Sequence, residues 1–136
     1  MNNLAFIKNE PNRYFHVTEM KSLKSILKEG LKPQMGPRSL TIGEDQPKIY
    51  LFSKIEELDN ALMNWLGEEF EDGWDLAILQ VDLPETFPVD TAIDDNGVPM
   101  WESTSSQLIE PKFITEIYDE YYMPMKGIYQ CQHPVA

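Results

Sequence analysis

The chain has 136 residues, 42% of them hydrophobic, with a formal net charge of −12 and a single cysteine. This length fits one domain with a sizeable core, no apolar run approaches the roughly 20 residues that span a bilayer, and the N-terminus lacks the layout of a secretory signal, so we expect residues 1–136 to form one soluble, cytoplasmic domain. The negative charge argues against a general nucleic-acid binder, because affinity for phosphate backbones comes mainly from Lys and Arg.

The first predicted elements are a strand and a helix. Residues 14–17 have the pattern of a strand, and Thr18 is expected to cap the helix that follows, with Gly30 just after its end. The apolar positions of that helix recur with a period near 3.6 residues, and they are Met20, Leu23, Ile26 and Leu27. Residues 32–48 contain three prolines and two glycines, which predicts a long loop of the kind that often carries function.

Residues 49–52 are predicted to form the next strand, and a second helix follows it. Ser53 and Glu56 form a capping-box pattern at its start, and Gly67 follows its end. The apolar face of this helix is expected to consist of Leu58, Leu62, Trp65 and Leu66.

The last part of the chain is predicted to contain strands and one long loop. Residues 76–81 are apolar except for Gln80, as is typical of a central strand buried on both faces. Residues 82–99, with three prolines and five carboxylates, predict a loop, and residues 100–109 and 113–121 predict the last strands. The order of elements indicates a mixed α+β domain, and the absence of a Gly-rich turn between strand and helix argues against a Rossmann or P-loop site.

Cysteine and histidine are scarce in this sequence. Cys131 has no partner for an internal disulfide, and with only two histidines a zinc site built from Cys and His has too few ligands. We therefore expect no metal site.

Charge is unevenly distributed along the chain. Residues 1–40 carry a net charge of +4, whereas residues 41–136 carry −16, so we expect a bound phosphate to meet the first third of the chain. Lys21, Lys24 and Lys28, at helical spacing, have a simpler interpretation as a solvated helix face. Arg38 differs, because a planar guanidinium in the turn at residues 36–39 can reach a pyrophosphate with two hydrogen bonds.

Three residues on separate predicted strands offer the most distinctive chemistry. His16 lies in the first strand, Tyr50 in the second, and Glu102 at the opening of a later one. Together they can hold a nucleotide, stack on its base and stabilise a positive charge on its ribose. We expect the three side chains to face one cleft, with Arg38 at its rim.

Four segments occur in an order that resembles a known family. They are His16-Val17-Thr18, the helix end at residues 26–31, Gly36-Pro37-Arg38-Ser39, and Tyr50-Leu51-Phe52-Ser53. In this order they resemble the front half of the His-Tyr-Glu type of ADP-ribosyltransferase fold, which RNA 2′-phosphotransferases and ADP-ribosylating toxins share. Glu102, ahead of residues 108–114, is similar to the Glu that completes the set. The resemblance covers roughly residues 14–118 and implies a mainly antiparallel sheet with two helices in the N-terminal half.

The resemblance implies a role for each of these residues with NAD as a substrate. His16 would bind ribose hydroxyls, Tyr50 would stack on the nicotinamide, and Glu102 would stabilise the positive charge that develops as nicotinamide leaves. The NAD-contacting residues implied by the resemblance also include Thr18, Arg38, Ser39 and Phe52, of which Arg38 and Ser39 would contact the pyrophosphate.

The resemblance implies transfer of ADP-ribose to a macromolecular acceptor, and we expect a protein rather than a nucleic acid. Arginine-specific members often carry Glu or Gln two positions before the catalytic Glu, and Met100 in that position argues against arginine as the acceptor. Glu110 competes with Glu102 for the catalytic role.

Two alternative functions remain open from the sequence. The first keeps the fold and changes the reaction to RNA 2′-phosphate transfer or NAD hydrolysis. The second is a small acidic binding or inhibitor protein without enzymatic activity, whose charge of −12 would steer it to a basic partner. An inhibitor would not require His16, Tyr50 and Glu102 to converge.

Overall fold

In a computed structural model of the chain, residues 4–33, 47–64, 75–93, 95–97 and 99–125 are described. Within these residues, six strands form one open antiparallel sheet in the order β4-β5-β2-β1-β3-β6. The strands are β1 (Arg13–Glu19), β2 (Ile49–Phe52), β3 (Leu76–Asp82), β4 (Asp90–Ile93), β5 (Pro99–Ser105) and β6 (Ile114–Asp119). The helices are α1 (Leu23–Glu29) and α3 (Ile55–Asn64), with short 3₁₀ helices η1 (Leu4–Phe6), η2 (Met20–Ser22) and η4 (Pro111–Phe113).

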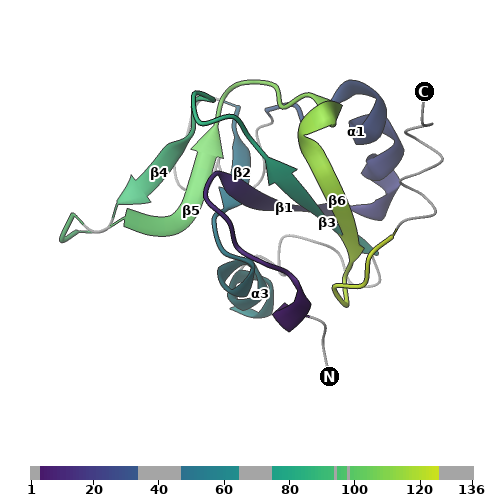
Figure 1. Cartoon of the computed structure of the whole chain (residues 1–136), viewed down its shortest axis with the longest axis horizontal. Coiled ribbons are helices and arrows are strands. Elements are labelled where there is room, and N and C mark those ends of the chain that lie inside the picture. Colours follow the sequence, from purple (N-terminus) through teal and green to yellow (C-terminus); the bar gives the residue numbers. More distant parts are fainter. Residues whose placement is uncertain (1–3, 34–46, 65–74, 94, 98, 126–136) are drawn as a thin grey trace.

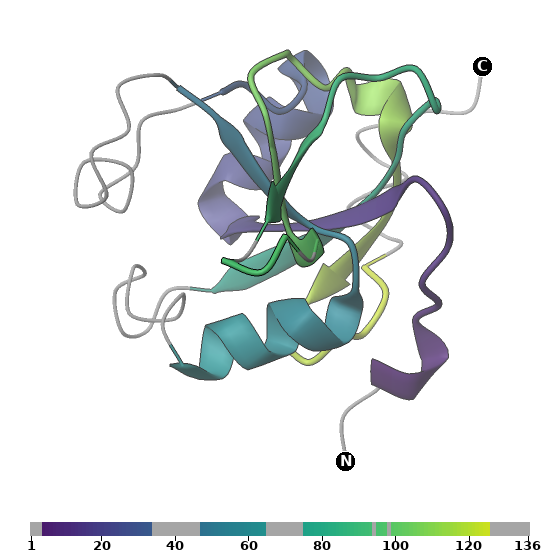
Figure 2. The same cartoon turned by 90° about the vertical axis from the view of Figure 1, so that its left-hand side faces the viewer.

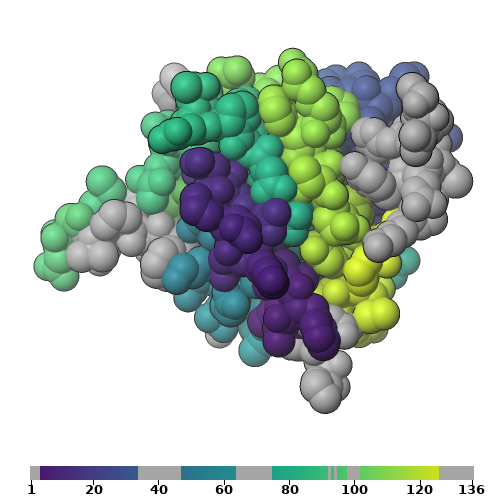
Figure 3. All heavy atoms as spheres, in the orientation of Figure 1, coloured from purple at the N-terminus to yellow at the C-terminus, as the bar shows by residue number. Residues whose placement is uncertain are grey.

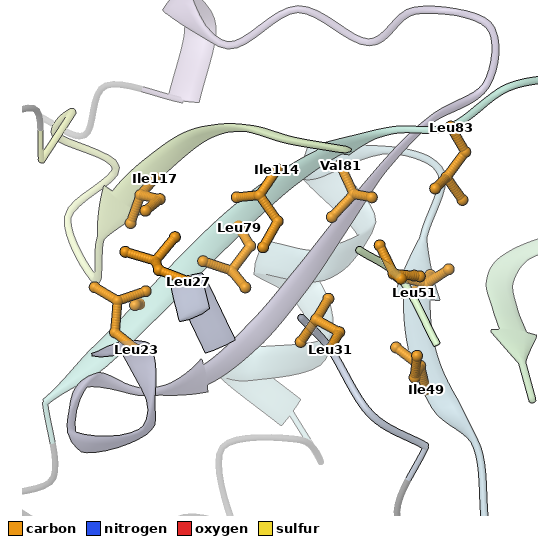
Figure 4. Close-up of a cluster of buried hydrophobic side chains, with 12 residues drawn as sticks. Leu23, Leu27, Leu31, Ile49, Leu51, Leu79, Val81, Leu83, Ile114 and Ile117 are labelled. Atoms are coloured by element: carbon orange, nitrogen blue, oxygen red, sulfur yellow. The ribbon is translucent and has the colours of Figure 1, made fainter. Parts of the chain in front are cut away.

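Helices α1 and α3 cover opposite faces of the sheet, so the core has two layers (Figure 2). On the α1 face, Leu23, Leu27 and Leu31 pack against inward-facing residues of the strands (Figure 4). On the α3 face, Ile55 and Leu58 pack against the strands together with residues near both ends of the described chain. The predicted mixed α+β class is confirmed.

Three strands were predicted correctly, because their apolar residues strongly favour a buried strand. The segments predicted at 14–17, 49–52 and 76–81 correspond to β1, β2 and β3. Gln80 is buried along with its apolar neighbours in β3, which is covered on both faces.

No helix in these described ranges is long and apolar enough to cross a membrane.

The start of the first helix differs from the sequence prediction. Thr18 belongs to β1 and therefore does not cap a helix; the helical region opens as η2, and α1 begins at Leu23. Its N-cap residue, Ser22, makes no side-chain capping hydrogen bond. The strand persists past Thr18 because the pairing with β3 continues as far as Glu19.

The start of α3 is capped from a distant part of the chain. The helix begins at Ile55, one residue later than a capping box on Ser53 predicts. The Ile55 N–H donates to Asn9 Oδ1 at 2.9 Å, and Asn9 Nδ2 donates to Glu56 Oε1 at 2.8 Å. A residue 46 positions earlier therefore supplies the cap. The predicted helix residues from 65 onward lie outside the described residues.

The segment predicted as a loop at residues 82–99 contains a strand, so that prediction was wrong. β4 forms a hairpin with β5, and the Asn96-Gly97 pair lies in the turn, where Gly97 has φ +81°. Asn-Gly between two strands is a strong hairpin signal, which the density of prolines and carboxylates obscured. β5 also ends at Ser105, before the predicted limit of 109, and Ile109 instead pairs with Leu31.

Gly30 fixes the path of the chain from α1 back to the sheet. Its backbone has φ 92° and ψ 177°, a region that is essentially restricted to glycine. A Cβ atom at this position would lie 2.4 Å from the carbonyl oxygen of Ile109, which accepts a hydrogen bond from the Leu31 N–H. The close approach of two backbones therefore requires the absence of a side chain.

Gly30→Ala is expected to lower the free energy of unfolding by more than about 2 kcal/mol, because backbone strain and a backbone clash add together. Gly97→Ala is the matched control, since Gly97 also has positive φ but has no atom within 4 Å of the added Cβ. Gly97→Ala is expected to lower the free energy of unfolding by about 1 kcal/mol. Urea unfolding of both variants measures the difference, and equal losses would show that contact with Ile109 is unimportant.

Candidate functional site

The pairing between β1 and β2 includes fewer residues than any other strand pairing in the sheet. β1 pairs with β3 over seven residues, from Arg13 to Glu19, but with β2 at one pair only, Phe15 with Phe52. β2 runs at a steep angle to β1 (Figure 1). We call residues 15–19 of β1 and 49–52 of β2 the β1–β2 junction.

The pairing on the other side of β1 shows which backbone groups face this junction. The Met20 N–H, just beyond β1, donates to Asp75 O at 2.8 Å. Successive residues of a strand direct their N–H and C=O to opposite neighbours. His16 therefore bonds toward β3, and the N–H and C=O of Phe15 and Val17 point toward β2.

Val17 presents a donor and an acceptor that make no ladder pair with β2. In a continuous ladder, the residue after the Phe15–Phe52 pair on this edge would be Val17 opposite Tyr50, and that pair is not formed. Tyr50 O is instead 2.7 Å from the ring Nδ1 of His16. A side chain thus takes the place of a backbone donor where the strands separate.

The hydrogen bond to Tyr50 fixes the state of the His16 imidazole. A carbonyl oxygen can only accept, so Nδ1 carries the proton and Nε2 of the neutral ring is left as an acceptor. Burial lowers the pKa of His16 below its usual 6.5, and the bond to Tyr50 opposes that shift in part. The ring is therefore neutral at physiological pH.

The strand register assigns the three principal residues to two faces of the sheet. His16 lies opposite Leu79, whose side chain belongs to the α1 face. Glu102 lies opposite Phe52, which is packed on the α3 face, and Tyr50 shares that face because it is two residues from Phe52. The expectation that all three side chains face one side is therefore wrong for His16, which reaches the junction from the opposite face.

Tyr50 and Glu102 are diagonal neighbours on adjacent strands. Tyr50 pairs with Thr104 of β5, and Glu102 is two residues from Thr104. Such diagonal positions are about 7–8 Å apart between Cα atoms, within reach of a ring and a long side chain. Both side chains are partly exposed, and within the described ranges no side chain donates a hydrogen bond to the Glu102 carboxylate. The carboxylate is thus available to a ligand that lies against Tyr50.

The remaining residues predicted to bind NAD have different surroundings. Thr18 is partly buried on the face of His16, opposite Ala77. Phe52 is 5% exposed and packs in the core with Phe15, so its ring serves the fold. Arg38 and Ser39 lie outside the described residues.

Glu110, the competitor of Glu102, lies at the start of η4 and not on a strand of the sheet. It precedes η4 and makes an ion pair with Lys112 at 3.4 Å. Its backbone lies against Gly30, at the end of α1. Glu110 therefore lies outside β2 and β5, the strands that carry Tyr50 and Glu102.

The backbone of Val17 is a candidate functional element that sequence reasoning missed. Its contribution depends on the failure of two strands to pair, and no residue pattern in the sequence signals that failure.

Within the described residues, no group of three His, Cys, Asp or Glu side chains is arranged to hold a metal ion.

Comparisons of the chain with protein families, with curated proteins and with solved structures find no match. The functional assignment therefore rests on the residues and geometry of the β1–β2 junction.

His16 is expected to make folding stability depend on pH. Because burial lowers its pKa in the folded protein, the unfolded chain binds more protons below about 6.5, and the free energy of unfolding should fall as the pH decreases through that value. His16→Asn retains a side-chain N–H for Tyr50 O and removes the titration. Its free energy of unfolding, measured in urea between pH 5 and 8, should decline less steeply toward acid.

His133→Asn is the matched control, because it removes the other histidine in the sequence. An unchanged pH slope in His16→Asn would contradict the neutral, buried state of the His16 ring.

Proposed function

We propose that the protein has an ADP-ribosyltransferase-like fold and is an NAD-dependent ADP-ribosyltransferase that modifies a macromolecular acceptor, a protein rather than a nucleic acid. The observation that carries the proposal is the interrupted pairing of β1 with β2 beside His16 and Tyr50. A ligand at this interruption would meet His16 from one face of the sheet and Tyr50 with Glu102 from the other. The opposite faces of these residues count against a one-sided cleft, so a shared ligand would have to pass between β1 and β2 to reach all three.

The backbone of Val17 suits the nicotinamide end of NAD. A carboxamide carries one donor group and one acceptor group, and an extended residue offers an N–H and a C=O on the same edge. Two hydrogen bonds to Val17 would fix the plane of the carboxamide. The ring of Tyr50, on the adjacent strand, can then stack on the pyridine ring.

His16 suits a ribose hydroxyl because its protonation state is fixed. Nδ1–H is held by Tyr50 O, so Nε2 can accept a hydrogen bond from a hydroxyl donor. The low pKa keeps this acceptor unprotonated near neutral pH. The same bond holds the ring orientation, so little side-chain freedom is lost when ligand binds.

Glu102 suits the charge that appears during the reaction. The bond between ribose C1′ and the nicotinamide nitrogen breaks, its electron pair leaves with nicotinamide, and positive charge develops on the ribose. The acceptor nucleophile then forms the new bond to C1′ and releases its proton. A carboxylate directed at this charge lowers the barrier because the attraction is strongest in the transition state.

The predicted phosphate contacts fit the charge distribution of the sequence. Arg38 and Ser39 belong to the first forty residues, whose net charge is +4 in an otherwise acidic chain. We propose that they contact the pyrophosphate, as the resemblance implies.

An acidic binding protein without enzymatic activity is the second candidate, favoured by the net charge of −12. RNA 2′-phosphate transfer is less consistent with the sequence, because an added RNA phosphate needs several basic residues around it and the chain offers only Arg38 with nearby lysines. Release of nicotinamide from NAD separates the first candidate from the second.

Glu102→Gln is expected to lower nicotinamide release by roughly a hundredfold or more while leaving the affinity for NAD nearly unchanged, because the carboxylate acts on charge that is absent in the ground state. Chromatography of released nicotinamide and calorimetric titration with NAD measure the two quantities. Glu110→Gln is the matched control and should retain full turnover. The reverse result would transfer the catalytic role to Glu110.

Tyr50→Ala is expected to weaken NAD binding and turnover together, because stacking acts in the ground state and in the transition state alike. Tyr50→Phe retains the ring and should preserve both. Steady-state kinetics with calorimetry distinguishes the pair of variants. Normal NAD affinity in Tyr50→Ala would remove the ring from the nicotinamide site.

A further inference from the structure

The two edges of the sheet differ in how they are closed. At β6 the chain returns and continues the sheet, since the Met125 N–H donates to Ile117 O at 2.8 Å and the Asp119 N–H to Met123 O at 2.9 Å. At the other end, β4 is the last strand, and among the described residues no segment pairs with its outer edge. The β4–β5 hairpin projects from one end of the molecule (Figures 1 and 3).

The pairing across the sheet identifies the backbone groups on this open edge. Phe52 directs its N–H and C=O to β1, so Glu102, its partner in β5, directs its own to β4. Thr104, two residues along, does the same and pairs with Asp90. The next residue, Thr91, therefore directs its N–H and C=O outward, where an incoming strand can bond to them.

The charge around this edge selects the kind of partner. The sequence of residues 83–105, which carries β4 and β5, contains five carboxylates and no Lys, Arg or His. Asp90 in β4 is exposed, and no side chain in the described part of the chain pairs with it. A basic segment is attracted to this surface, whereas a second copy would bring the same negative charge against it.

We propose that the outer edge of β4 binds an extended, lysine- or arginine-rich segment of another protein by strand addition. The Thr91 N–H and C=O bond to the backbone of the segment, and alternate basic side chains lie on the face of Asp90. β4 is short, and its register with β5 shifts between Thr91 and Ile93. These are features that limit indiscriminate edge pairing, so only a short segment of complementary charge is accepted.

The position of the edge relates this surface to the candidate active site. Adjacent strands are about 4.8 Å apart, so an added strand would lie about 10 Å from β5, which carries Glu102. Asp90 shares the face of Tyr50 and Glu102, so basic side chains on that face extend toward the same region. The bound segment then contains the acceptor residue, a consequence that rests on the proposed function, whereas binding itself does not.

The test uses the full chain and a synthetic peptide of about ten residues in which lysine alternates with valine, long enough for a single added strand. Calorimetry measures its affinity without NAD, and amide NMR shifts locate it. We expect binding that weakens with salt, with the largest shifts in β4. A glutamate–valine peptide of equal length, and a lysine–valine peptide with N-methylated backbone, should not bind.

Thr91→Pro removes the outward N–H without breaking a ladder bond, and it should weaken peptide binding about tenfold or more. Thr91→Val is the matched control, because it keeps the N–H and loses only the hydroxyl that accepts from Ser103 at 3.4 Å. It should bind the peptide like the original protein.

Three results would overturn the proposal: equal binding of the N-methylated peptide, NMR shifts confined to other surfaces, or a concentration-dependent dimer that protects the β4 amides. The N-methylated peptide keeps the test decisive if Thr91→Pro fails to fold, because it needs no variant. Nicotinamide release is measured separately, so a bound peptide with no nicotinamide release would reject the proposed function and leave the docking surface intact.

Discussion

The single backbone pair between β1 and β2 is the constraint on which the proposed site depends. Seven pairs hold β1 to β3, so the position of β1 is set by that neighbour and not by β2. Beyond Phe15 and Phe52 the strands separate, and the His16 ring bonds to Tyr50 O in the place of a backbone N–H. Near the centre of the sheet, the backbone of Val17 therefore lies outside the β1–β2 ladder, while both faces keep their cores.

The elements with strong apolar patterns could be predicted from the sequence, and the site geometry could not. β2 and β3 follow from runs of buried residues such as Leu51 and Leu79, whose burial overrides other preferences. The face on which a residue lies depends on register between strands far apart in the chain. Adjacent residues of a strand point to opposite faces. Phe15 shares the α3 face with Phe52 and Glu102, so His16, the next residue along β1, lies on the other face.

The failed predictions share a physical cause, which is competition from distant parts of the chain. Thr18 was available as a cap, but pairing with β3 extended the strand through it. The segment before β5 was rich in prolines and carboxylates, and the turn at Gly97 nevertheless folded it back as β4. Local propensity predicts an element well only where no long-range pairing opposes it.

The cap that Asn9 places on α3 joins the stability of two regions that the chain order keeps apart. A helix of ten residues is marginal alone, and its first turn here depends on a side chain that precedes β1. Loss of the segment around Asn9 would therefore be felt first at Ile55, across the sheet from α1, and not at the N-terminus itself. The two regions should exchange their amide hydrogens with solvent as one cooperative unit.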